Sequence, residues 1–367
     1  MKFLYENLPR SAKARLLTKK RVVDIDVSEE GVKVSCDDGS IHEGALVIGA
    51  DGVRSTVRQH LQARHLGIRP EDIPSAQKNP YKATHQLYFA TANSLPGLAL
   101  NTRWETADNG MCTQIVVGKN RTWFGVYEQF DTPTSTQSRY TEADKAEIRK
   151  KWADVYMAPG LKFRDVDAKR NSDSGLIDLQ EGLVDTWFWK RIVLVGDAIR
   201  KMEPHAGLGY NCGVMDIVVL ANALQEMLQS GEEAPTTQDL ERLFSQYQAD
   251  RADETQKAAT LSKQVVGNLA WPSWKEKAMS MYILPYFPLN RWVCNHQIAP
   301  FISNTPVLEW LDEEELPGSL VPWKHHPFPR KRIADGSQFW PAVSYTVLVL
   351  FSASIVGVLG VVRGNCG

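Results

Sequence analysis

Several common signatures are missing from the 367-residue sequence. Its five cysteines are scattered and never spaced as Cys-x-x-Cys, so we expect reduced thiols rather than a disulfide framework or a metal site. A formal net charge of −1 gives no basis for binding nucleic acid. The first ten residues carry Lys2, Glu6 and Arg10 and no long apolar run, so we expect no secretory signal. What is present is a 43% apolar composition, which predicts a substantial core and two interleaved domains.

The most informative segment begins with a short apolar run, Ile192 to Val195, that ends at Gly196. A run of this length and composition is typical of a strand buried on both faces of a parallel sheet. Asp197 then stands at the carboxyl end of the strand, where such sheets bind ligands. Its carboxylate only accepts hydrogen bonds, which suits the hydroxyls of a sugar or ribitol chain. An ordinary turn between a strand and a helix is the alternative for Asp197 taken alone.

A glycine-rich loop and the start of a helix follow, from Pro204 to Asn211. Gly207 and Gly209 have no Cβ, so the backbone there can adopt positive φ and approach a planar ring system. Asn211 is expected to cap a helix whose N-terminus would stabilise negative charge on a bound group. The apolar positions with helical spacing are Val214, Ile217, Val218, Ala221, Leu224 and Leu228. Strand, acid, loop and helix together predict a cofactor cradle.

A second segment of similar design occupies residues 45–58. Residues 46–48 predict another buried strand, and Gly-Ala-Asp-Gly at 49–52 predicts a tight turn into a helical segment. Before it, residues 22–27 and 32–36 alternate between apolar and polar side chains and predict strands of a meander. The implied local structure is a three-stranded meander that leads into a buried strand.

The two segments, in this order, resemble the single-component FAD-dependent monooxygenases of the aromatic-hydroxylase type. The resemblance is closest to the membrane-anchored epoxidases of meroterpenoid and indole-diterpene biosynthesis, and it covers nearly the whole chain. It implies that FAD is reduced by NADPH, that O₂ is activated, and that one oxygen atom is delivered to a prenyl double bond. The cofactor supplies this chemistry, while the protein excludes water and positions the alkene.

The resemblance also implies roles for individual residues, although it leaves the catalytic residues unknown. Asp197 would bind the ribitol of FAD, and the loop from Pro204 to Asn211 would lie against the isoalloxazine. The motif from Asp51 to Arg58 is associated with the FAD pyrophosphate and with NADPH use. The implied cofactor-binding residues are Asp51, Gly52, Arg58, Gly196, Asp197, Pro204, Gly207, Gly209, Tyr210 and Asn211.

The sequence departs from this family in several places. The family begins with a strand, a Gly-x-Gly-x-x-Gly turn and a helix that hold the ADP half of FAD, and no such segment exists here, so we expect an N-terminally shortened chain. Arg200 replaces a usual histidine, Tyr210 replaces a small residue beside the flavin, and His85-Gln86 replaces a tyrosine and a basic residue. Two other functions stay open: a non-catalytic, membrane-anchored remnant, and a flavin-dependent reductase of isoprenoid double bonds.

The predicted fold class is α/β, with an FAD-binding Rossmann-like domain that lacks its opening βαβ unit and is interleaved with a β-sheet substrate domain. The expected boundaries are 1–74 and 186–266 for the FAD-binding domain, 75–185 for the substrate-binding β domain, 267–338 for a C-terminal helical segment and 339–362 for a transmembrane helix.

Within the substrate domain, residues 85–92, 111–117 and 122–127 predict strands, and 118–120 predict a hairpin turn. The aromatic candidates to line an apolar pocket, with ordinary core packing as the alternative, are Trp104, Trp123, Phe124, Tyr127 and Phe130. Residues 142–156 and 240–266 predict helices. The second of these helices is expected to present a solvated face formed by Asp250, Arg251, Asp253 and Glu254.

The C-terminal region contains 24 residues without a charge, from Phe339 to Val362. This length exceeds the roughly 20 residues that span a bilayer, so we expect a transmembrane helix. Basic residues precede it more often than they follow it, which predicts a cytosolic body on a single-pass C-terminal anchor, in the endoplasmic reticulum. The expected partners are a lipophilic small-molecule substrate and membrane lipid, with no nucleic acid and no metal.

Overall fold

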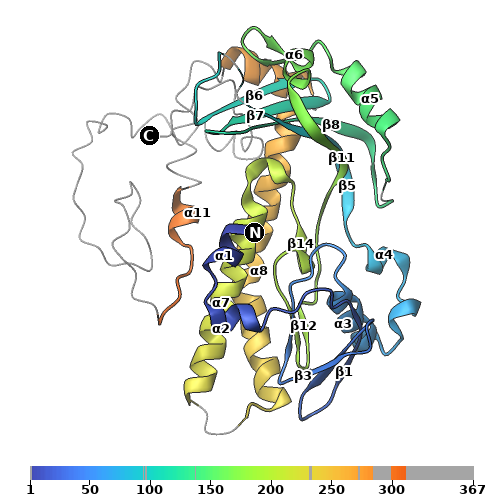
Figure 1. The fold of residues 1–367 in the computed structure, drawn as a ribbon, viewed down its shortest axis with the longest axis vertical. Coiled ribbons are helices and arrows are strands. Elements are labelled where there is room, and N and C mark those ends of the chain that lie inside the picture. Colours follow the sequence, from blue (N-terminus) through green and yellow to red (C-terminus); the bar gives the residue numbers. More distant parts are fainter. Residues whose placement is uncertain are drawn as a thin grey trace, which may run out of the picture. The chain divides into compact units, whose positions relative to one another are not determined.

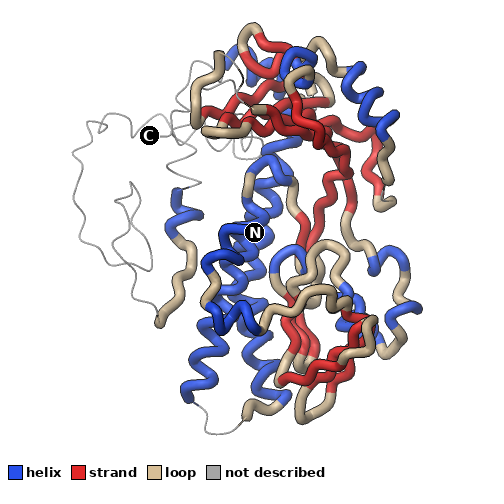
Figure 2. Tube along the Cα trace, viewed as in Figure 1, coloured by secondary structure: helices blue, strands red, loops and turns tan. Residues whose placement is uncertain are grey.

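The computed structural model of the protein describes residues 2–310 except 94, 96, 137, 231–233, 272 and 284–298. The chain divides into two compact units. Unit 1 comprises residues 1–78, 185–199 and 223–249, and unit 2 comprises residues 79–184, 200–222 and the chain from 250 onward. Figure 1 shows their helices and strands, and Figure 2 distinguishes these by colour. The domain boundaries expected from the sequence stay predictions.

Unit 1 contains two small sheets and several short helices. Its elements are α1 (Lys2–Asn7), α2 (Arg10–Ala14), β1 (Val22–Val27), β2 (Val32–Cys36), β3 (Ile41–Gly44), β4 (Val47–Gly49), α3 (Thr56–Leu66), η1 (Pro70–Asp72), α4 (Ser75–Lys78), β12 (Phe188–Trp189), β13 (Ile192–Leu194) and η2 (Gly196–Ala198). Strands β1, β2 and β3 pair antiparallel in sequence order, which confirms the predicted meander.

The second sheet of unit 1 has the order β12-β13-β4, and its β13–β4 pair is parallel. All three residues of β13 are buried, which confirms the strand predicted at Ile192. The burial predicted for residues 46–48 is wrong, because Leu46 and Val47 are half-buried and the side chain of Ile48 is 45% exposed. The reason is position in the sheet: β4 pairs with β13 alone among the described strands, so it forms an edge.

Arg191, next to β13, connects several segments of unit 1 through hydrogen bonds in its interior. Its guanidinium donates hydrogen bonds to Thr237 Oγ1 and to the carbonyl of Ala45, each over 3.0 Å. It also donates to the carbonyls of Glu29 and Pro235. Because Arg191 is buried, these acceptors replace the water that the charge would otherwise need.

Unit 2 is built on a six-stranded sheet of order β14-β11-β5-β8-β7-β6. Its elements are β5 (Lys82–Ala92), β6 (Thr102–Asp108), β7 (Met111–Val117), β8 (Thr122–Thr134), α5 (Glu142–Lys151), β9 (Tyr156–Ala158), β10 (Leu161–Lys162), α6 (Phe163–Asp167), β11 (Arg170–Leu183), β14 (Arg200–Lys201), η3 (Pro204–Ala206), α9 (Trp274–Ala278), the π-helix Met279–Ile283 and α11 (Ala299–Ser303). Helices α7 (Leu208–Ser230) and α8 (Thr237–Leu269) contribute residues to both units.

The two faces of this sheet differ because successive side chains of a strand point to opposite sides. One face carries Phe124 and Val126 of β8 and is covered by α5 and α6, which add Ile148, Phe163 and Val166 to the main core (Figure 1). The other face carries Leu87, Cys112, Tyr127 and Leu179 with Phe89 and Trp123. The predicted strands β5, β7 and β8 and the turn at 118–120 are therefore confirmed, with Gly118 N–H bonded to the Arg121 carbonyl over 3.0 Å.

Two helix predictions need correction. The helix predicted over 142–156 ends at Lys151, because the chain turns there and Tyr156 begins strand β9. The solvated face predicted for α8 is wrong at Arg251, which is 1% exposed. Arg251 is buried because Asp216 of α7 accepts a hydrogen bond from its Nε over 3.1 Å.

No helix in the described part of the chain is both long enough and apolar enough to cross a membrane. The transmembrane helix predicted over 339–362 lies outside the described residues, as does most of the predicted segment 267–338. Cys36, Cys112 and Cys212 are buried free thiols, as the scattered cysteine pattern predicts.

Candidate functional site

In unit 1, the loop after β4 is closed by the side chain of Asp51. Its Oδ2 accepts the backbone N–H of Thr56 over 2.7 Å and that of Val57 over 3.1 Å. Ser55 is the N-cap residue of α3, and its hydroxyl accepts the N–H of Arg58 over 2.8 Å. The first N–H groups of a helix have no acceptor within the helix, so these side chains satisfy them. Asp51 therefore shapes the turn in which Gly52 adopts φ +79°.

Arg58 links this loop to the loop that follows the neighbouring parallel strand β13. It donates hydrogen bonds to the carbonyls of Val53, over 2.7 Å, and Ala198, over 2.8 Å. Its side chain is buried, while Asp197, one residue before Ala198, is half-buried. The two predicted motifs thus meet at the carboxyl ends of adjacent parallel strands, where ligands bind in such sheets. Gly196 adopts φ +63° at the same edge.

In unit 2, the loop from Pro204 to Gly207 leads directly into α7. The predicted positive φ is present at Gly207, at +69°, and absent at Gly209, which already lies in the helix. The predicted cap at Asn211 is also wrong, because α7 begins three residues earlier, at Leu208. Asn211 lies in the first turn, and its Nδ2 donates to the Gly207 carbonyl over 3.2 Å. The helix starts early because Gly207 in the left-handed region ends the preceding 3₁₀ turn η3.

The loop at Gly207 fits a flat group that approaches the backbone closely. Among the described residues, apart from the chain neighbours and the nearby backbone of α7, no heavy atom lies within 4 Å of the point where a Cβ would stand at Gly207 or Gly209. Tyr210, on the first turn of α7, is 67% exposed. The N-terminus of a 23-residue helix also favours negative charge. These features suit a flavin ring and its anionic reduced form. The charge of Arg58 in unit 1 is instead used in hydrogen bonds to backbone carbonyls.

Two ionisable residues on either side of Pro204 contact the sheet of unit 2. His205 is buried, and its Nε2 lies 2.8 Å from Oε1 of Glu105 on β6. Glu105 also accepts hydrogen bonds from Gln114 Nε2, over 2.9 Å, and from Arg103. Burial alone would raise the pKa of Glu105, but the contacts with His205, Arg103 and Gln114 outweigh it and lower that pKa to about 2. Tyr127 packs edge-on against His205, with ring centres 4.7 Å apart.

Glu203 is buried on the other side of Pro204, and its carboxylate has a different environment. The ionisable side chain that faces it from β5 is His85, whose Nδ1 lies 3.7 Å from Oε1. Neither carboxylate oxygen makes a hydrogen bond within the described structure. Burial raises the pKa of Glu203, and the nearby His85 only partly offsets this. Glu203, His205 and Glu105 are not among the residues predicted from the sequence. The signal that could have indicated the first two is a pair of ionisable residues on either side of a proline in a glycine-rich loop.

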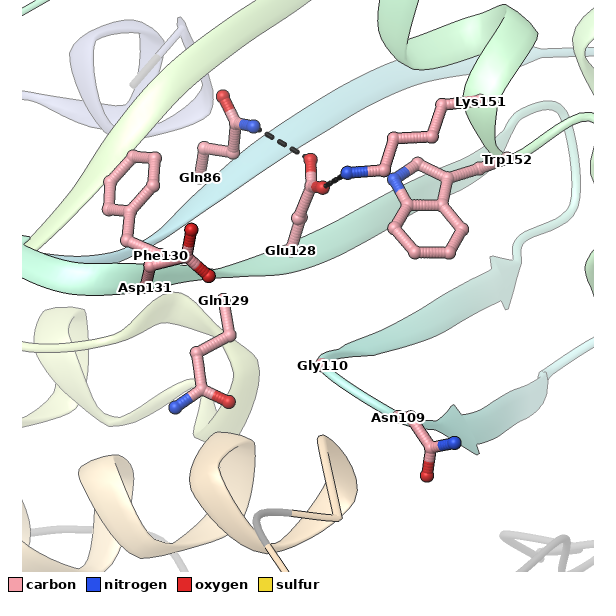
Figure 3. Close-up of a pocket in the computed structure, with 9 residues that line it drawn as sticks. All are labelled: Gln86, Asn109, Gly110, Glu128, Gln129, Phe130, Asp131, Lys151 and Trp152. Carbon is pink, nitrogen blue, oxygen red and sulfur yellow. Dashed lines mark hydrogen bonds and ion pairs between the residues drawn. The ribbon is translucent and has the colours of Figure 1, made fainter.

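A pocket of about 320 Å³ opens at one end of the same sheet (Figure 3). Glu128 of β8 accepts a hydrogen bond from Gln86 Nε2 over 2.7 Å and is paired with Lys151. Lys151 Nζ also lies 5.0 Å from the centre of the Trp152 ring. The other lining residues are Asn109, Gly110, Gln129, Phe130 and Asp131. None of the cofactor-binding residues predicted from the sequence lines this polar pocket.

The aromatic residues predicted to line an apolar pocket are distributed over several environments. Phe124 and Tyr127 are fully buried core residues, which agrees with the alternative of ordinary core packing. Trp104 packs against the core under α5 and α6, and Trp123 packs on the opposite face. Phe130 alone among them lines the pocket of Figure 3. Strand alternation determines these outcomes, because neighbours in β8 point to opposite faces.

Arg200, which replaces the usual histidine of the family, is buried in an ion-pair network. Its guanidinium is paired with Asp216 of α7, which also pairs with Arg251 of α8. Arg251 in turn pairs with Glu254. The network joins the strand before the Gly207 loop to the third turn of α7 and to α8, so it fixes the chain on both sides of that loop.

A family model and individual relatives of known name agree on the family of the chain. A model described as "FAD binding domain" matches residues 1–262. An FAD-dependent monooxygenase of Neurospora crassa is 30% identical over 338 residues, covering 88% of this chain and 74% of that protein. One of Aspergillus fumigatus is 28% identical over 361 residues, covering 97% and 72%.

Solved structures extend the likeness to the fold. Klebsiella pneumoniae HpxO, complexed with FAD and uric acid, has a TM-score of 0.58 at 17% identity and covers 77% of this chain and 66% of that one. A salicylate hydroxylase substrate complex has a TM-score of 0.55 at 19% identity, covering 79% and 71%. At these identities the likeness concerns the fold alone.

Proposed function

The chain belongs to the FAD-binding-domain family, among the FAD-dependent monooxygenases of fungal secondary metabolism, and we propose that it uses NADPH and O₂ to epoxidise a prenyl double bond. The observation that carries the proposal is the loop at Gly207. There a left-handed glycine, open space beside the backbone and the start of a long helix coincide. In this proposal the flavin is faced by two loop residues, Pro204 and Gly207, and by three residues at the start of α7, namely Gly209, Tyr210 and Asn211.

The proposed roles in unit 1 follow the geometry of its loops. Asp197 accepts hydrogen bonds from the ribitol hydroxyls, since it stands half-buried beyond the end of β13. Gly196 and Gly52 give the backbone the left-handed turns on which these loops depend. Asp51 and Arg58 act on the cofactor indirectly, because their hydrogen bonds fix the loops rather than point outward.

A lipophilic substrate is supported by the second face of the unit 2 sheet. Val116 is 42% exposed and Ile177 is 45% exposed, and each lies beside larger apolar side chains. Val116 pairs with Trp123 across β7 and β8, and Ile177 pairs with Leu87 across β11 and β5. Partly exposed apolar groups on one face provide the contact area that a prenyl chain requires. We further propose that residues 339–362 anchor the protein in the endoplasmic reticulum membrane, into which such a substrate partitions.

The direct test is to purify the full chain with detergent and record its absorbance. The proposal expects a bound-flavin spectrum that bleaches with NADPH, and O₂ uptake when air is admitted. With isotopically labelled O₂ and a prenylated aromatic probe, the product should gain one labelled oxygen atom. A colourless protein that gains no spectrum with added FAD would contradict the proposal. A product that gains two hydrogen atoms without O₂ uptake would instead identify an isoprenoid reductase.

A pair of variants tests the cofactor site itself. Asp197→Ala removes hydrogen bonds from a charged acceptor, which are worth about 1.5–3 kcal/mol, so FAD affinity should fall by at least about tenfold. Asp185→Ala removes an exposed carboxylate that precedes β12 and should leave FAD affinity unchanged. FAD affinity is measured by fluorescence titration of the apoprotein. Equal affinities for the two variants would remove Asp197 from the site.

A further inference from the structure

The segment before Gly207 contacts the unit 2 sheet through two pairs, each made of a carboxylate and an imidazole. The loop contributes the acid in one pair and the imidazole in the other. On one side of Pro204, the loop contributes the acid, Glu203, and β5 contributes His85. On the other side, the loop contributes His205 and β6 contributes the acid, Glu105. All four side chains are buried. Similar chemistry is thus placed twice on a loop that we propose to face the flavin.

The environment of Glu105 keeps its carboxylate ionised at neutral pH. His205 Nε2 lies 2.8 Å from its Oε1, and Gln114 and Arg103 donate hydrogen bonds to the same oxygen. These contacts stabilise the carboxylate, and its pKa of about 2 keeps it ionised throughout the neutral range. A group that stays ionised cannot take up and release a proton during turnover at neutral pH.

Glu203 has the opposite environment. Neither of its oxygens has a hydrogen-bond partner within 3.5 Å in the described structure, and its side chain is fully buried. The His85 ring and the Thr84 hydroxyl, both on β5, act on the carboxylate and lower its pKa, but burial outweighs them. The groups that act on it electrostatically come from several strands: His85 of β5, Glu181 of β11, Cys112 of β7 and Tyr127 of β8. Ser262 of α8 donates to the Glu203 carbonyl over 2.6 Å and so fixes the backbone at this point. Burial and the like charge of Glu181 favour the neutral acid, while His85 favours the carboxylate.

A buried, unsatisfied carboxylate costs stability, and a better-packed neutral residue would avoid that cost. The proposed reaction supplies a reason for such a group. NADPH, O₂, substrate and one proton from solvent give NADP⁺, the oxygenated product and water. NADPH provides two electrons, one oxygen atom enters the product, and the other leaves as water. Each turnover therefore consumes one proton, and a buried acid beside the Gly207 loop can supply it where water is excluded.

We propose that Glu203, with His85 beside it, holds the proton that each turnover consumes and delivers it at the Gly207 loop, while Glu105 and His205 only fix that loop. This inference rests on the proposed monooxygenase function. It assigns Glu203 as a residue that cycles between acid and carboxylate and His85 as the residue that positions it. The two pairs should therefore respond differently to isosteric amide substitution.

The first experiment measures folding rather than turnover. An acid whose native pKa is raised binds more protons in the folded state, so stability falls as pH rises from the unfolded pKa near 4.5 to the native pKa. In that range the unfolding constant of the full chain should rise by up to tenfold per pH unit relative to Glu203→Gln, which has no proton to lose. The control Glu128→Gln removes a buried carboxylate on the opposite face of the sheet. Its unfolding constant should rise with pH as steeply as that of the wild type. Parallel pH profiles for wild type and Glu203→Gln would overturn the proposal.

The second experiment measures turnover in flavin-loaded protein. Glu203→Gln should bind FAD as the wild type does but oxygenate substrate at least about tenfold more slowly, with little dependence on pH. His85→Gln removes the contact that lowers the pKa of Glu203, so the alkaline fall of turnover should move to higher pH. Glu128→Gln should leave turnover and its pH profile unchanged. Wild-type turnover in Glu203→Gln, or an unmoved profile in His85→Gln, would overturn the assignment.

The two experiments also separate this inference from the proposed function. If the purified chain binds no FAD, the monooxygenase proposal fails, yet the unfolding comparison still shows whether Glu203 holds a proton in the folded state. If Glu203→Gln does not fold, His85→Gln decides the matter through its pH profile. A chain that oxygenates substrate but shows no effect in either variant would retain its function and lose this inference.

Discussion

At the scale of single residues, Asp51 and Arg58 illustrate what a motif does and does not reveal. The sequence predicts that they lie near a cofactor, and the structure places them beside the ends of two parallel strands. Their hydrogen bonds, however, go to the backbone of those loops. The spacing of a motif predicts which loop a side chain belongs to. The hydrogen-bond partner of that side chain depends on which backbone N–H and C=O groups lack a partner at the start of the helix, and the motif does not show this.

The contacts of Glu105 lead to a prediction about the free energy of unfolding at low pH. Its pKa is lowered in the folded state to about 2, from 4.5 in the unfolded chain. A lowered pKa contributes stability that is present above pH 4.5 and is lost as pH falls towards 2. The difference of about 2.5 pKa units corresponds to about 3 kcal/mol. Urea unfolding between pH 6 and pH 3 should therefore show a smaller decline in Glu105→Gln than in the wild type.

The matched control for this prediction is Glu43→Gln, on the exposed strand β3. Glu43 forms a surface ion pair with Lys33, and such pairs contribute little. Its pH profile should follow that of the wild type. If Glu105→Gln and wild type lose stability in parallel on acidification, the His205 contact does not stabilise the ionised carboxylate.

At the scale of elements, the start of α7 shows why a helix can be predicted correctly and its N-cap residue wrongly. Asparagine is a favoured N-cap residue, so Asn211 is a reasonable choice from the sequence. The structure begins α7 at Leu208, because Gly207 takes the left-handed conformation and ends the preceding turn. Two glycines in the same loop look alike in sequence, and only the backbone dihedrals distinguish their roles. The period of the apolar residues predicts the helix itself but not its first turn.

The two glycines make a paired prediction. Gly207→Ala places a Cβ in the left-handed region and should destabilise the protein by about 1–2 kcal/mol. Gly209→Ala lies in a helix with open space around it and should stabilise the protein by about 0.5–1 kcal/mol. Both should weaken FAD binding, since each methyl group occupies the space proposed for the flavin. Denaturant titration and FAD titration measure the two effects separately, and a Gly209→Ala variant with unchanged FAD affinity would place the flavin elsewhere.

The ion-pair network of β14, α7 and α8 makes a second prediction at this scale. The sequence indicates a charged surface at Arg251, because charges usually lie on the solvated face of a helix. Asp216 instead pairs with two buried arginines. Asp216→Asn removes the carboxylate that pairs with Arg200 and leaves Arg251 with Glu254 as its acidic partner, so the free energy of unfolding should fall by about 3–5 kcal/mol. Asp253→Asn, at an exposed position of α8, should change it by less than about 0.5 kcal/mol. Similar unfolding midpoints for the two variants would contradict this account of the network.

At the scale of the whole molecule, local pattern accounts for the class of fold better than for its connections. The meander, the parallel pair and the strands of the large sheet are predictable because alternation and apolar runs are local signals. Contacts between distant segments are not local. His205 meets Glu105 across a hundred residues of chain, and Glu203 meets His85 across more. Such pairs follow from strand order and register, which no short window of sequence contains.

The last prediction concerns the C-terminal region, where the uncharged residues 339–362 are proposed to anchor the protein. The full chain should sediment with membranes and resist extraction at alkaline pH, while a chain that stops at residue 338 should not. Leu350→Arg places a charge near the middle of the proposed span, which costs about 2.5–3.5 kcal/mol and should reduce insertion markedly. Ser337→Arg lies just outside the span and should leave insertion unchanged. Because insertion depends on the position of the charge rather than on its presence, equal recovery of the two variants in the membrane fraction would show that residues 339–362 do not span the bilayer.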